Sequence, residues 1–258
     1  MKKISALIIA SSLSFGAHAQ LINAFNTESL AGYTTTTILD NSDGAGSGVS
    51  FSDSTGGLVA SFAGTLSDAE QALFLTPTAL PVGDALTVLT SIPASSTTED
   101  LGIAISATAT PTAAGSGNSY NSRTLYDWAS VSVRPSQNSI RSNTSINGTL
   151  TTSANVLSAA PTSVAELFIE NNGGGSFTMG YVDTGEVIHD SETVAFNSTS
   201  LIGSAIGIYG DIRVTGTSLG SLSDLTIEPI SDVPEPTSLA LAGLGLAGMG
   251  FLARRKKS

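Results

Sequence analysis

Two glutamates four residues apart, Glu166 and Glu170 in the stretch ELFIE, are the first residues whose spacing bears on catalysis. Glycosidases use a pair of carboxylates, about 5–5.5 Å apart for retention and about 6.5–9.5 Å apart for inversion. In a strand the two side chains would share a face but lie about 13 Å apart. The spacing therefore predicts two solvent-facing acids at strand ends rather than a catalytic pair.

Ser218 is the candidate nucleophile, because GTSLG at residues 216–220 matches the G-x-S-x-G pattern of hydrolases. That arrangement needs a histidine downstream of the serine, whereas His189 lies upstream. No helix-forming pattern follows the serine either. We therefore expect a loop before the last strand and no catalytic residue.

One compact cluster contains residue types that bind metals: Glu186, His189, Asp190 and Glu192. A second acidic segment, residues 40–43, continues into a glycine-rich stretch. Neither the zinc spacing nor the EF-hand register fits the cluster. Ordinary acidic turns are the expectation, and no metal or cofactor is predicted.

Aromatic residues suggest one further kind of site. Trp128, Tyr126 and Tyr120 could form a platform for stacking sugars, although a lone tryptophan in a β-sandwich is more commonly a core residue. Three asparagines fit the N-x-[ST] pattern, and we expect them in polar loops: Asn143, Asn147 and Asn197.

Charge and cysteine content narrow the class of protein. Residues 20–232 hold four arginines, no lysine and 20 of the 21 acidic residues, which gives a net charge of −16. Such a surface repels phosphate backbones and anionic lipid, which argues against a nucleic-acid partner. Cysteine is absent, so disulfides, thiolate metal sites and cysteine nucleophiles are excluded.

The elements that must position these residues are strands. Short alternating runs bounded by Gly, Asn and Asp turns predict an all-β sandwich or barrel in one domain, residues 20–232. The runs are 48–52, 57–62, 85–92, 101–107, 129–134, 164–169, 176–182, 205–209 and 222–227. Residues 67–70 fit a capping box for a short helix, although 71–76 equally suit a strand.

The rhythm of strands and turns over residues 166–229 resembles the two-sheet jelly roll of concanavalin A-like lectin and glucanase domains. The last strand of that fold pairs near the first, which would join 222–227 to the region around 25–33. The glucanases carry Glu-x-Asp-x-x-Glu on one strand, and that motif is absent here. Because lectin-like sandwiches often bind calcium in loops, the resemblance leaves calcium in an acidic loop as an alternative.

Both ends of the chain carry targeting patterns. Residues 1–19 have two lysines, a mostly apolar run and Ala17-His18-Ala19, which predicts a secretory signal peptide cleaved between Ala19 and Gln20. Residues 237–253 form an uncharged apolar stretch, about 25 Å long as a helix, which is at the short end for a membrane span. The cations that follow would stay cytoplasmic, so the body lies on the far side of the membrane.

The C-terminus, residues 233–258, resembles a PEP-CTERM sorting signal. Its parts are the motif Val233, Pro234, Glu235 and Pro236, the apolar helix, and a basic stop of Arg254, Arg255, Lys256 and Lys257. The resemblance implies recognition by an exosortase, a membrane-embedded transpeptidase, in a Gram-negative bacterium that makes exopolysaccharide or biofilm. The two prolines keep the motif extended, where an enzyme can reach it. A permanent tail anchor is the alternative.

These patterns together predict a non-enzymatic exported protein at the cell surface or in the exopolysaccharide matrix, with a structural or carbohydrate-binding sandwich. A polysaccharide-acting hydrolase with a dispersed site is one alternative, and it would need a close pair of carboxylates. A calcium-dependent adhesin is another. The low charge and the absence of any catalytic spacing favour the first interpretation.

Overall fold

The computed structural model describes residues 19–27, 29–40, 49–62, 70–94, 99–110, 127–157, 160–197, 200–212 and 220–229. Within these ranges the chain forms antiparallel strands and two short 3-10 helices, η1 (Pro135–Gln137) and η2 (Pro161–Ser163). The predicted all-β sandwich is confirmed. No helix among the described residues is long and apolar enough to cross a membrane.

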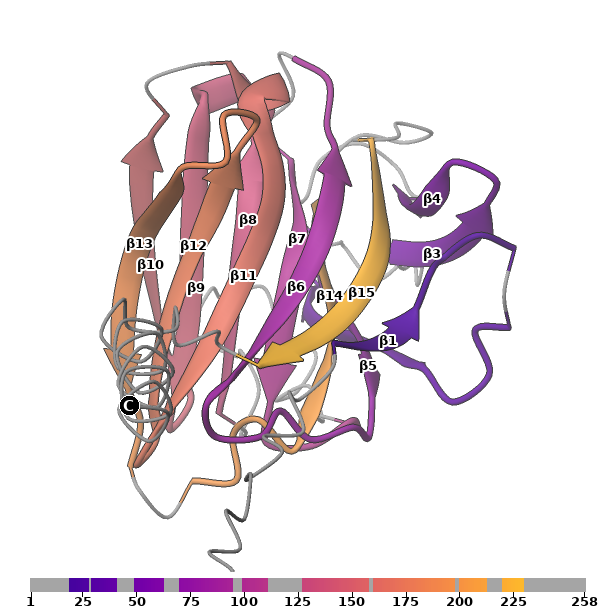
Figure 1. The fold of residues 1–258 in the computed structure, drawn as a ribbon. Helices are drawn as coiled ribbons and strands as arrows, with labels where there is room; N and C mark the ends of the chain where they lie inside the picture. The colour runs from indigo at the N-terminus through magenta and orange to yellow at the C-terminus, as the bar shows by residue number, and fades with distance from the viewer. Residues whose placement is uncertain are drawn as a thin grey trace, which may run out of the picture.

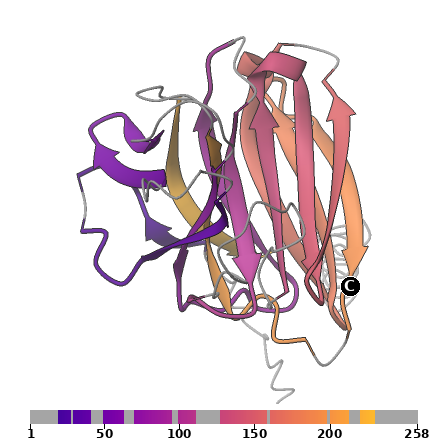
Figure 2. The same ribbon diagram turned by 180° about the vertical axis from the view of Figure 1, so that it is seen from behind.

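The strands make two sheets packed face to face (Figure 1). In spatial order, the eight-stranded sheet contains β13 (Ile188–Ala195), β12 (Ser176–Asp183), β11 (Val164–Gly173), β6 (Asp84–Ser91), β15 (Ser221–Pro229), β4 (Gly57–Phe62) and β3 (Val49–Ser54), with β1 (Gln20–Asn23) also paired to β15. The seven-stranded sheet, nearer the viewer in Figure 2, contains β10 (Thr149–Val156), β9 (Ser139–Ile146), β8 (Trp128–Arg134), β7 (Asp100–Ser106), β14 (Ala205–Ile212), β5 (Glu70–Thr76) and β2 (Thr34–Asp40).

Tight turns join several neighbouring strands. β9 and β10 are linked by Asn147 and Gly148, both with positive φ (51° and 78°). Two consecutive residues with positive φ are what a type I′ hairpin turn requires, and Asn-Gly is the preferred pair for it. Gly174 and Gly175 do the same between β11 and β12. These turns fix the register of the hairpins that carry the site described below.

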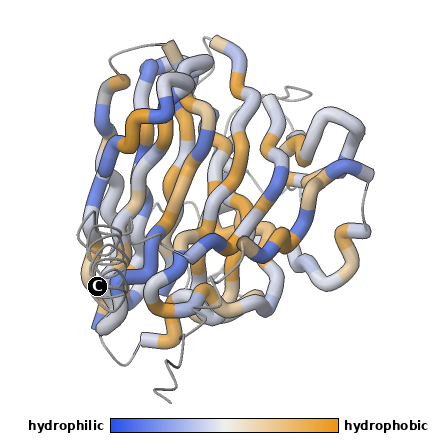
Figure 3. Tube along the Cα trace, viewed as in Figure 1, coloured by the Kyte–Doolittle hydropathy of each residue, from blue (hydrophilic) through white to orange (hydrophobic). Residues whose placement is uncertain are grey.

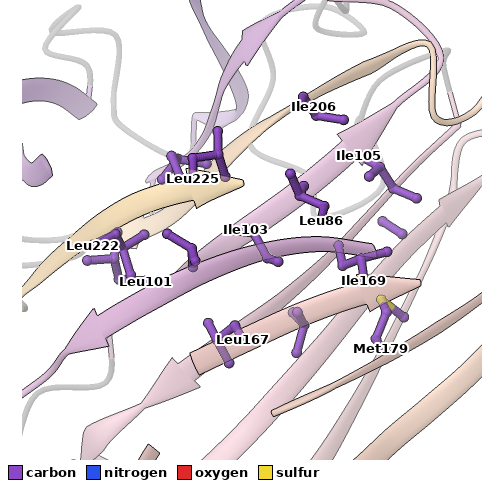
Figure 4. Packing of buried hydrophobic residues seen from close by; sticks show 14 of the residues in the cluster. Leu86, Leu101, Ile103, Ile105, Leu167, Ile169, Met179, Ile206, Leu222 and Leu225 are labelled. Carbon is purple, nitrogen blue, oxygen red and sulfur yellow. The ribbon is translucent and has the colours of Figure 1, made fainter. Parts of the chain in front are cut away.

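The core lies between the sheets and follows from the period of two along each strand. Hydrophobic and hydrophilic residues alternate along many of the strands (Figure 3). Leu86, Leu167 and Ile169 from the eight-stranded sheet face Ile103 and Ile105 from the seven-stranded sheet (Figure 4). All five are fully buried, and each such side chain contributes about 1.5–3 kcal/mol relative to an exposed one.

Two expectations about local structure need correction. The last strand, β15, pairs with Gln20–Asn23 and not with the region around 25–33. Phe25 and Thr27 have left-handed backbone (φ 52° and 63°), which ends the first strand, and Phe25 turns into the core. The capping-box alternative also fails, because Glu70 begins strand β5; Ser67 lies outside the described residues.

Candidate functional site

The outer face of the seven-stranded sheet carries a row of polar side chains. Core-facing Ala129, Val131 and Val133 alternate along β8 with residues that point the other way. The outward positions of β8 and β9 are Trp128, Ser130, Ser132 and Arg134, and Ser139, Arg141, Asn143 and Ser145. Seven of these eight side chains are buried, and Arg141 is half-buried.

Two aromatic rings stack on this face. The ring centroids of Trp128 and Tyr209 are 5.9 Å apart, with 21° between the ring planes. The rings come from β8 and β14, which flank β7, and the outward positions of β7 between them hold small side chains, at Gly102, Ala104 and Ser106. A Cβ on Gly102 would lie 2.0 Å from the carbonyl oxygen of Val131, so the close approach of β7 and β8 requires glycine.

A network of buried charged groups lies beside the rings. Asp100 of β7 and Asp211 of β14 are directly opposite each other in the ladder, and both side chains are fully buried. Arg134 bridges them: its Nε donates to Asp100 Oδ1, and its Nη2 donates to Asp100 Oδ2 (3.1 Å) and Asp211 Oδ2 (3.4 Å). Gln71 Nε2 also donates to Asp211 Oδ2 at 3.1 Å.

The protonation of Asp100 differs from that of an ordinary aspartate. Burial, together with the neighbouring charge of Asp211, raises the pKa of Asp100 to about 7, although Arg134 and Arg141 act in the opposite direction. Two buried carboxylates that share one guanidinium do not both ionise easily, because charge in a low-dielectric site is costly. This carboxyl therefore titrates close to neutral pH.

Several polar atoms of the row have no hydrogen-bond partner. They are Trp128 Nε1, Ser139 Oγ, Ser145 Oγ and Arg141 Nε, and each of these atoms is buried. Trp128 and Ser145 are cross-strand partners, so their unpaired groups lie next to each other. A buried polar group without a partner costs about 1–3 kcal/mol, and such groups are rare in folded proteins. A ligand with hydroxyl or carboxyl oxygens would pair them.

A second concave feature lies on the outer face of the eight-stranded sheet. Glu166 and Glu170 share this face of β11, as predicted, but they line a groove of about 400 Å³ together with Asp190 and Glu228. Burial, and then the charge of Glu228, raises the pKa of Glu166; burial, and then Asp190, raises the pKa of Glu170. The groove is acidic, and the two glutamates lie within the strand rather than at its ends.

The predicted cluster around His189 does not converge on one point. His189 Nε2 lies 3.0 Å from Asp183 Oδ2, and its ring stacks on Tyr181. Asp190 instead lines the groove on the opposite face. Across the described ranges, no group of three or more His, Cys, Asp and Glu side chains could hold a metal ion. Residues 41–43, the other calcium candidate, lie outside those ranges.

The remaining candidates divide between strands, turns and undescribed segments. Trp128 is 0% exposed, so it presents no ring face to a sugar, which agrees with the core alternative. Asn143 is wrong as a loop residue, because it is buried in β9, where it donates to Ser130 and accepts from Thr152. Asn147 is in the β9–β10 turn, and Asn197 follows β13.

Several predicted residues lie outside the part of the chain that the structure describes. They are Ser218, Tyr120 and Tyr126, the signal peptide up to His18, the sorting motif at residues 233–236, the apolar stretch at 237–253 and the basic stop at 254–257. Ala19 and Gln20 are described, and Gln20 is the first residue of β1. Their roles in sorting stay predictions.

Sequence reasoning missed the charged network. Asp100 and Asp211 flank the apolar runs that predict β7 and β14, and nothing in the spacing of Asp100, Arg134 and Asp211 joins them. One signal was available: Arg134 and Arg141 are two of only four cations in residues 20–232. Arginine in a lysine-free acidic body suggests a specific partner for its guanidinium group.

The fold is similar to that of lectin-like β-sandwiches. A protein of unknown function with a galectin-like fold from Bacillus subtilis is 11% identical, with a TM-score of 0.51 over 83% of this chain and 95% of that one. Lectin II from Ulex europaeus is 11% identical (TM-score 0.46; 76% and 97% covered), and a GH16 protein from a Bacteroides ovatus mixed-linkage glucan locus is 9% identical (TM-score 0.46; 80% and 96% covered). At these identities the likeness shows the fold alone.

The C-terminus carries a signal for protein sorting. Residues 232–256 match the PEP-CTERM protein-sorting motif. The chain is therefore an exported protein that transits the membrane, is processed by an exosortase and is sorted to the cell surface. No curated protein matches this sequence.

Proposed function

We propose that this protein is a non-enzymatic component of the surface or exopolysaccharide matrix of a Gram-negative bacterium, where its sandwich binds carbohydrate. The observation that carries the proposal is the row of buried, unpartnered polar groups on the outer face of the seven-stranded sheet. Sugars present several hydroxyl oxygens at once, and each can accept or donate a hydrogen bond. The exported, lectin-like sandwich supports the same function.

The chemistry of the row suits a sugar better than an apolar ligand. Ser139, Arg141 and Ser145 point to one side of β9, where successive outward positions are about 6.6 Å apart. The indole N–H of Trp128, whose ring stacks on Tyr209, is a further donor without a partner. Pairing these groups with ligand oxygens would recover the cost of leaving them unpaired.

Ser145→Ala is expected to weaken glycan binding by about fivefold, the equivalent of one hydrogen bond of about 1 kcal/mol. Binding of the full-length chain in mild detergent to a panel of neutral glucans and galactans, followed by calorimetry, measures the effect. Ser50→Ala, on β3 of the other sheet, is the matched control and is expected to bind as the wild type does. Absence of binding to this panel and to acidic glycans alike would leave only a structural role.

A polysaccharide hydrolase is the second candidate, and one observation favours it. Asp100 and Asp211 contact the same Arg134 nitrogen, and this is the kind of close carboxylate pair that the spacing of Glu166 and Glu170 lacks. Both carboxylates are fully buried and already hydrogen-bonded, which favours a structural role for the pair. Release of reducing ends from any bound glycan, lost in Asp211→Asn, would support the hydrolase instead.

Processing at the sorting motif predicts a defined product. We expect the protein recovered from the cell surface or the medium to end near residues 233–236, as measured by intact mass. Its N-terminus should be Gln20. Replacement of Pro234, Glu235 and Pro236 by alanine should leave the basic stop on the chain and keep the protein in the membrane fraction, because exosortase would no longer recognise it. A wild-type surface protein that still includes Arg254 would instead indicate a permanent anchor.

A further inference from the structure

The positive charge of the described body is concentrated at one place. Arg134 and Arg141 are the only arginine or lysine residues within the described ranges, and both lie on the outer face of the seven-stranded sheet. The body, residues 20–232, has a net charge of −16, and these two cations on adjacent strands bring positive charge to one place in it. Their positions coincide with the row of unpartnered polar groups.

The two arginines differ in how their donors are used. The guanidinium group of Arg134 donates hydrogen bonds to Asp100 and Asp211. Arg141 has a single long contact, from Nη1 to Asp100 Oδ2 at 3.5 Å, and its Nε is buried without a partner. The side chain of Arg141 is 20% exposed, so solvent or a ligand can reach part of it. The Nε–H is therefore a donor that no group of the protein uses, and part of the side chain around it reaches the surface.

A neighbouring side chain of Arg141 also lacks a hydrogen-bond partner. Ser139 lies two residues before it on the same face of β9, and its buried hydroxyl has no partner. A guanidinium edge matches the geometry of a carboxylate, since two parallel N–H groups can donate to its two oxygens. A neutral hydroxyl would satisfy only one of those donors and none of the charge.

We propose that the outer face of the seven-stranded sheet selects an acidic glycan, and that Arg141 pairs with the carboxylate of a uronate-type sugar. This inference rests on the proposed carbohydrate-binding function and names its ligand class. The acidic body repels a polyanion at long range, but salt screens that repulsion beyond about 10 Å at 0.1 M. Selection therefore depends on the short-range contact at Arg141.

Two polymers with one backbone test the selection. Polygalacturonate carries a carboxylate on each sugar, and its fully methyl-esterified form does not. We expect the full-length chain, in mild detergent at 0.15 M salt, to bind the acid form at least tenfold more tightly. Arg141→Gln should abolish this preference, and Arg141→Lys, which keeps the charge but not the planar edge, should retain only part of it.

The variants are interpretable only if they fold, so their melting temperatures and circular dichroism are measured first. Because Arg141 is partly exposed and makes one long contact, Arg141→Gln should melt close to the wild type. Equal binding of both polymers, or of neutral glycans, with no effect of Arg141→Gln would overturn this inference and leave the proposed function standing. Failure to bind any acidic or neutral glycan would overturn both.

Discussion

Arg134→Met is expected to lower the free energy of unfolding by about 3–5 kcal/mol, because it removes the guanidinium that bridges the buried carboxylates of Asp100 and Asp211. The Arg134 side chain is 6% exposed and the two aspartates are 0% exposed, so water cannot replace the lost partner. For a domain of this size the loss corresponds to a fall of about 10 °C in melting temperature. Thermal and urea unfolding followed by circular dichroism measure both quantities.

Two further variants separate charge from packing. Adding Asp100→Asn and Asp211→Asn to Arg134→Met also removes the charges of the two buried carboxylates. We expect this triple variant to regain much of the lost stability. Arg141→Gln, at the edge of the same network, should cost far less. An Arg134→Met protein that melts within a degree of the wild type would show that the network does not stabilise the fold.

Stability is expected to fall as the pH rises from about 4 to about 7, with a lower melting temperature at pH 8 than at pH 5. The pKa of Asp100 is about 7 in the folded protein against an ordinary value of 3.8. Between these two values the folded state binds the proton more tightly than the unfolded chain. Raising the pH therefore removes a proton that stabilises the fold, and above about pH 7 this contribution is lost.

The raised pKa values of Glu166 and Glu170 act in the same direction, so a variant must isolate Asp100. Asp100→Asn cannot ionise and should show a flatter dependence of melting temperature on pH. Glu192→Gln, on β13, removes a carboxylate elsewhere and should keep the wild-type slope. A wild-type protein that is equally stable at both pH values would contradict a raised pKa for Asp100.

Much of the fold could be predicted from local patterns because apolar alternation reports directly which face of a strand is buried. The run 57–62 is β4, 176–182 lies within β12, and 222–227 lies within β15. The strands that escaped prediction are rich in Ser, Thr and Asn, notably Ser139–Ile146 and Thr149–Val156. The polar residues of Ser139–Ile146 are mostly buried, whereas those of Thr149–Val156 are exposed or half-buried. In both strands the alternation of hydropathy that marks a strand is therefore weak.

The candidate site was harder to predict than the fold because its residues meet only through sheet pairing. Asp100 and Asp211 are far apart in the sequence and become neighbours when β14 pairs with β7. Glu166 and Glu170, by contrast, are close in sequence, and strand geometry alone places them on one face. Local spacing thus predicted that the two glutamates share a face, whereas the groove that they line with Asp190 and Glu228, and the network on the other sheet, depend on the topology of the sandwich.

The position of β15 constrains when this exported chain can finish folding. β15 is the last described strand, yet it pairs with β6 and β4 in the interior of its sheet and also with β1 at the start of the body. An exported chain emerges with its N-terminus first. The edges of β6 and β4 that pair with β15 therefore stay unpaired until β15 has been translocated. Such unpaired edges can pair with other chains and lead to aggregation. The sorting motif begins at residue 232, three residues after β15, so the strand that completes the sheet lies directly before the segment that is recognised for sorting.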